Sequence, residues 1–126
     1  MESTIYRILL SGHKFAREVI VNEDNLCSFL HTVRNCPLAV IMGPENTIFL
    51  RMEQGNLIGD KKIKIQLQEI EQAEQAGNWS PLSLYQISYY CILHETVYLY
   101  AKNRDQAKKD FLTWSIFEPD VIVLVA

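Results

Sequence analysis

The residues of this chain with the widest chemical range are three histidines, three cysteines and six tyrosines. His94 lies next to Glu95, and a neighbouring imidazole and carboxylate can act as an acid–base pair. The two residues also begin an HExxH zinc motif, but Tyr98 stands where the second histidine is required. Because adjacent residues of a strand point to opposite faces, this pair favours a solvated hairpin tip over an active site.

Nucleophilic catalysis needs a thiol or hydroxyl held against a base. Cys27 and His31 are four positions apart, so they would lie on one side of a helix. The neighbouring Phe29 and Leu30 indicate that this side grades into the core, where burial raises the pKa of a thiol. No CxxC spacing and no phosphate-binding glycine loop is present. We therefore expect no catalytic residue, metal site or cofactor.

The most informative pattern is aromatic and lies between residues 85 and 101. Alternation along two strands would place Tyr90, Tyr98 and Tyr100 on one face together with Ser88 and His94. Such a face is less apolar than a core, yet tyrosine offers a large contact area with a polar tip and is enriched at protein interfaces. This pattern predicts a protein-binding surface.

Two further aromatic residues are expected to extend that surface. Trp79 lies in a loop, and Phe49 falls on the polar side of an alternating strand. A helix that covers the tyrosine face would instead make the same residues part of a core. The residues leave both alternatives open, since an antiparallel sheet can leave one face uncovered.

A second interpretation treats the same residues as the lining of a ligand pocket. Tyr90, Tyr98, Tyr100 and His94 would form its walls, and Arg51 would anchor an anionic group. Catalytic groups need not be close in sequence, so missing motifs do not exclude this interpretation.

These residues must be positioned by a regular series of elements. Hairpins are predicted at 4–21, 38–53 and 85–101, the last turning at 94–96. A helix follows each of the first and third, starting after the caps Asn22 and Asn103. Residues 61–76 are expected to begin as a short strand and continue as a helix. The final strand, 121–125, is apolar in both alternating positions and is expected to be central.

This order predicts a single α+β domain over residues 1–126. We expect a mainly antiparallel sheet of about six to seven strands, with two to three helices packed on one face. Hydrophobic residues make up 48% of the chain and charged residues 21%, which is ordinary globular composition.

Charge and hydropathy limit the partners. The formal net charge is −3 without a basic stripe, which makes nucleic-acid binding unexpected. The longest apolar run, 121–126, is far shorter than the roughly 20 residues of a membrane-spanning helix, so no membrane association is expected. No signal segment is visible, and the odd number of cysteines fits a reducing compartment, which predicts a cytoplasmic protein.

Together these patterns predict a small intracellular protein-binding module of a regulatory, chaperone-like or immunity/inhibitor type. Its expected partner is another protein, and a homodimer formed through the same face is a further possibility. The alternative is a small ligand-binding domain or enzyme with a Tyr/His-lined pocket, although enzymatic activity is the less favoured expectation.

Overall fold

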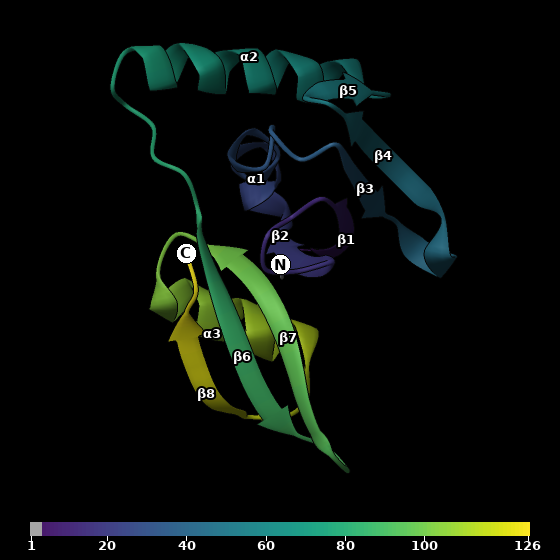
Figure 1. Cartoon of the computed structure of the whole chain (residues 1–126), viewed down its shortest axis with the longest axis vertical. Coiled ribbons are helices and arrows are strands. Elements are labelled where there is room, and N and C mark those ends of the chain that lie inside the picture. The colour runs from purple at the N-terminus through teal and green to yellow at the C-terminus, as the bar shows by residue number, and fades with distance from the viewer. Residues whose placement is uncertain (1–3) are drawn as a thin grey trace.

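Eight strands form one mixed sheet in the computed structural model, which describes residues 4–126. Their order across the sheet is β5-β4-β3-β1-β2-β7-β6-β8 (Figure 1). All neighbours are antiparallel except β2 and β7. The strands are β1 (Ile5–Ser11), β2 (Glu18–Asn22), β3 (Leu38–Met42), β4 (Ile48–Glu53), β5 (Asn56–Ile58), β6 (Ser83–Tyr90), β7 (His94–Ala101) and β8 (Pro119–Leu124).

The α+β class is confirmed, and the predicted strand count of six to seven is one or two too low. Residues 56–58 form the additional strand β5, because the turn at Gln54 and Gly55 directs the chain back along β4. The parallel pair β2–β7 was not predicted. This pair joins strands β1–β5 to the β6–β7 hairpin. Its two strands are far apart in the sequence, so patterns of local hairpins cannot indicate it.

Three helices accompany the sheet: α1 (Leu26–Thr32), α2 (Lys61–Gln75) and α3 (Arg104–Trp114). Each follows a side chain that caps a helical turn. Asn22 accepts the N–H of Asp24 ahead of α1, in a short 3-10 turn over Glu23–Asn25, and Asn103 accepts the N–H of Gln106 at α3. These two predicted helix starts are confirmed.

The helices do not pack on one face of the sheet, as the sequence led us to expect. Phe29 and Leu30 of α1 lie in a core on one side, whereas Phe111 of α3 lies in a second core with Ile20 and Leu99. Strand β2 serves both cores, since Val19 and Val21 belong to the first and Ile20 to the second. The sheet therefore has two half-covered faces, and each core fills one half of the molecule.

Helix α2 begins at Lys61, so the short strand predicted at the start of residues 61–76 is wrong. Asp60 caps this helix by accepting the N–H of Lys62 at 2.8 Å, which favours a helical start over the β-like alternation of Ile63 and Ile65. None of its fifteen residues is buried, because the helix lies on α1 rather than on the sheet (Figure 1).

The C-terminal strand β8 lies at the edge of the sheet, not at its centre as predicted. It pairs with β6 alone, and only Ile122 points into the core under α3. The β6–β7 hairpin turns at residues 91–93 and not at 94–96 as predicted, so His94 is the first residue of β7. No helix within residues 4–126 is long and apolar enough to cross a membrane.

Candidate protein-binding face

The half of the sheet built from β7, β6 and β8 is covered along its length on one side, whereas on the other side only the end with Leu84 and Tyr100 is buried, in the first core. Helix α3 closes the side on which Tyr85, Ile87 and Leu99 lie, and Phe111 fills the space between helix and strands. Figure 1 shows α3 behind these strands, with no helix in front of the lower part of the hairpin. The uncovered side is the one that the tyrosine pattern singled out.

The pairing register defines this uncovered side. Val121, Ser88 and Thr96 lie opposite one another across the three strands, and the next row holds Val123, Gln86 and Tyr98. Tyr90 and His94 pair at the far end of the hairpin. We call these eight residues the open face: Gln86, Ser88, Tyr90, His94, Thr96, Tyr98, Val121 and Val123.

The open face carries no Asp, Glu, Lys or Arg, although such residues make up 21% of the chain. The rings of Tyr90 and His94 contact each other, with centroids 4.8 Å apart, and both side chains are exposed. Tyr98 is half-buried. Depletion of charge together with tyrosine enrichment is typical of the centre of a protein–protein interface.

Apolar exposure continues onto the edge strand. The exposed fractions are 47% for Val121, 48% for Val123 and 61% for Leu124. A strand that ends a sheet presents unpaired backbone N–H and C=O groups, and natural proteins normally shield such an edge with charge, proline or a cover. Pro119 and Asp120 serve this purpose at the beginning of β8, and in its middle the guanidinium of Arg104 donates to the backbone C=O of Ile122 at 2.6 Å. The side chains of Val121, Val123 and Leu124 supply no charge there.

Tyr100 lies on the same side of β7 as Tyr98, but α1 covers it. Its exposed fraction is 6%, its ring contacts Phe29 at 5.3 Å between centroids, and its hydroxyl lies 2.7 Å from Nε2 of His13. Burial, with a smaller effect from Cys36, raises the pKa of Tyr100 to about 12. This tyrosine belongs to the core and cannot contact a partner on the open face.

His13 is held in one tautomer by its neighbours. Its Nδ1 accepts the backbone N–H groups of Phe15 and Ala16, each at 3.1 Å. The remaining proton therefore sits on Nε2, which donates to the Tyr100 hydroxyl. Burial lowers the pKa of His13 below its ordinary value, so the ring closes the β1–β2 loop as a neutral group.

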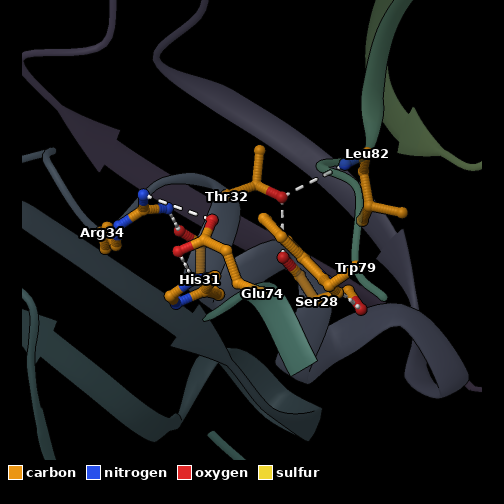
Figure 2. A network of polar contacts seen from close by, with 7 residues as sticks. All are labelled: Ser28, His31, Thr32, Arg34, Glu74, Trp79 and Leu82. Atoms are coloured by element: carbon orange, nitrogen blue, oxygen red, sulfur yellow. Dashed lines mark hydrogen bonds and ion pairs between the residues drawn. The ribbon is translucent and has the colours of Figure 1, made fainter. Parts of the chain in front are cut away.

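Trp79 lies outside the open face, in a polar network between α1, α2 and the segment that leads to β6 (Figure 2). Its ring packs edge-on against His31 at 4.7 Å between centroids, and its Nε1–H donates to Ser28 Oγ at 3.3 Å. His31 and Arg34 both contact the carboxylate of Glu74, at 3.1 and 3.6 Å. This network fastens the end of α2.

Phe49 and Arg51 also lie away from the open face. A bulge between Ile41 and Met42 leaves Phe49 without an opposite residue, and its ring contacts Tyr6 at 5.5 Å on the α2 side. Arg51 pairs with Glu53 at 3.2 Å on β4, which three strands separate from β7. The structure therefore brings Tyr90, His94 and Tyr98 together but leaves Tyr100, Trp79, Phe49 and Arg51 elsewhere.

The sequence reasoning missed several residues that the fold places together. Gln86 and Thr96 join the open face only through the register of β6 and β7, and Val121 and Val123 only because β8 is an edge strand. The continuous apolar run of β8 was the available signal, but a strand buried on both faces gives the same signal.

No group of three or more His, Cys, Asp or Glu residues suited to a metal ion occurs within residues 4–126. Comparisons with models of known protein families, with curated proteins and with solved structures give no match to this chain. The candidate function therefore depends on the geometry of the chain itself.

Proposed function

We propose that this chain is a protein-binding module whose partner adds a strand to the outer edge of β8 and covers the open face. Extension of a sheet through main-chain hydrogen bonds is a common mode of recognition, in which alternate side chains supply specificity. The open face, which includes Val121 and Val123, and the outer edge of β8 would form one continuous interface.

The observation that carries this proposal is the position of β8. Its residues Val121 to Leu124 are all apolar, as in a strand buried on both sides, yet three of these four are at least 47% exposed. A partner strand that covered them would displace the Arg104 guanidinium from the C=O of Ile122, pair the remaining edge and bury the uncharged face in the same step.

The geometry gives less support to a Tyr/His-lined pocket. Arg51 is too remote from His94 to serve the same ligand, and Tyr100 is buried against Phe29. Without Arg51 and Tyr100, the proposed pocket lining is reduced to Tyr90, Tyr98 and His94, which lie on the surface of the sheet. We therefore retain the binding module as the proposal.

Two matched edge variants test it. Val123→Lys places a charge on the open face, and Ile58→Lys places the same charge on β5 at the other edge of the sheet, where the side chain is 44% exposed. Tagged wild-type protein and both variants would be used to isolate partners from the native lysate, after circular dichroism has shown that all three fold.

A partner that depends on the open face should bind Ile58→Lys normally and Val123→Lys about 30-fold more weakly, since a lysine buried in an interface costs about 2 kcal/mol. Size-exclusion chromatography of the purified chain tests whether the partner is a second copy. In that case the wild-type protein is a dimer and Val123→Lys is a monomer. Equal retention by both variants would refute the proposal.

A further inference from the structure

A groove far from the open face separates α2 from the start of α1. Glu23, Leu26 and Cys27 line one wall, Ile63 and Ile70 of α2 line the other, and its volume is about 570 Å³. The groove stays open because α2 rests on α1 without burying any of its own residues. Its size lies within the range of about 300–1,000 Å³ that ligand-binding clefts occupy.

Apolar side chains make up part of the lining of the groove. Leu26 is buried in the first core, and Ile63 and Ile70 are half-buried along α2. Tyr6 and Phe49 lie beside one another at the β-sheet end, and Phe49 remains 41% exposed. Several apolar side chains of a ligand could displace water from this lining, which is the main source of affinity in such clefts.

The rim of the groove is acidic. Glu23, Asp24, Asp60 and Glu69 contribute carboxylates, and Lys62 is the one basic residue of the lining. These carboxylates also affect neighbouring groups. Burial raises the pKa of Tyr6, and the charge of Glu23 raises it further. Burial likewise raises the pKa of Cys27, and the charge of Glu69 adds to that effect. Neither Glu23 nor Glu69 forms a salt bridge within residues 4–126.

We propose that this groove binds a basic amphipathic segment of a partner protein. The apolar side chains of the segment would enter the space between Leu26, Phe49 and Ile70, and its Lys or Arg side chains would face Glu23 and Glu69. An amphipathic peptide laid into an apolar groove is a recurrent recognition mode, and here the charge on the rim selects the sign of the peptide. This site is separate from β8, so the inference does not depend on the function proposed above.

The test uses a fluorescein-labelled twelve-residue peptide of leucine and lysine in a helical repeat, and a second peptide in which glutamate replaces every lysine. Fluorescence anisotropy of the folded, full-length chain should show saturable binding of the first peptide only. Neutralising the rim with Glu23→Gln and Glu69→Gln should weaken that binding about tenfold. The control Glu71→Gln with Glu118→Gln removes the same charge from exposed sites outside the groove and should leave binding unchanged.

The cysteines of the chain locate the bound peptide. Cys27 is half-buried in the groove, 3.0 Å from Gln66 Oε1, whereas Cys91 is exposed in the β6–β7 turn. Bound peptide should slow iodoacetamide alkylation of Cys27 at least threefold and leave the rate at Cys91 unchanged. The proposal is overturned if both peptides bind equally, if the two double variants behave alike, or if Cys27 is not protected. Val123→Lys should still bind the peptide. A failure of the proposed β8 interface would therefore leave peptide binding in the groove unaffected.

Discussion

Individual buried and half-buried polar residues set much of the local order of this chain. The imidazole of His13 is fixed by two backbone N–H donors and by the hydroxyl of Tyr100. Asn22 and Asp110 form a similar link between the end of β2 and α3, at 3.0 Å. Because these partners are 87 and 88 residues apart in the chain, respectively, no short sequence pattern could have indicated them.

His13 should make stability depend on pH. Its folded-state pKa lies below the ordinary value of 6.5, so its contribution is complete above about pH 6.5 and is lost as the pH falls through that value toward the folded pKa. His13→Asn keeps an acceptor for the N–H groups of Phe15 and Ala16 but cannot titrate in this range. In urea unfolding, the wild-type protein should lose stability relative to this variant between pH 7 and pH 5. A constant difference would contradict the assignment.

Asp110 should show the opposite sign. Its side chain is 2% exposed, its Oδ2 has no hydrogen-bond partner within residues 4–126, and burial raises the pKa of its carboxyl above 3.8. The folded state therefore holds the proton more tightly, and the carboxylate costs stability increasingly as the pH rises above about 4.

Asp110→Asn keeps the acceptor for Asn22 and removes the buried charge. We expect it to raise the free energy of unfolding at pH 7 by about 1 kcal/mol, with the gain shrinking toward pH 3. Asp105→Asn, on an exposed position of the same helix, is the control and should give no such gain. Destabilisation by Asp110→Asn at pH 7 would show that the carboxylate has a partner that we have not identified.

At the scale of elements, α2 is the part most weakly attached. It buries none of its residues, and the contacts of Glu74 with His31 and Arg34 hold its C-terminal end (Figure 2). Glu74→Ala should therefore cost about 1 kcal/mol, a modest value because these ionic groups are partly exposed.

The loss should be local. Hydrogen exchange of the α2 amides should accelerate in Glu74→Ala while exchange in β1, β2 and β7 stays near the wild-type rate. The control Glu71→Ala removes a carboxylate from the same helix and leaves the network of Glu74 in place. Faster exchange throughout the central strands would mean that α2 and the sheet unfold as one unit.

The elements also show how far sequence reasoning reached. Local signals located all three hairpins and the caps Asn22 and Asn103, because turns and helix starts depend on neighbouring residues. The strand order, the parallel β2–β7 pair and the second core under α3 depend on contacts between distant segments. The candidate site was partly predictable for the same reason: alternation along one hairpin grouped Tyr90, His94 and Tyr98, while burial of Tyr100 required α1.

For the whole molecule, the two cores lie on opposite faces, and each leaves part of the sheet uncovered. The open face with β8 and the acidic groove beside α2 are consequently at different ends of the molecule (Figure 1). Two partners, or two parts of one partner, could bind without competing. The groove would select basic segments by charge, whereas the open face would select a strand by shape and main-chain pairing.

Site-specific photo-crosslinking tests the central claim most directly. A benzophenone-bearing residue would replace Ser88, at the middle of the open face, and in a separate variant Arg51, which is exposed on β4. The account predicts a discrete crosslinked protein species at position 88 in the native cells and none of that mass at position 51. Crosslinking at position 51 alone, or the same products from both positions, would contradict an interface on the open face.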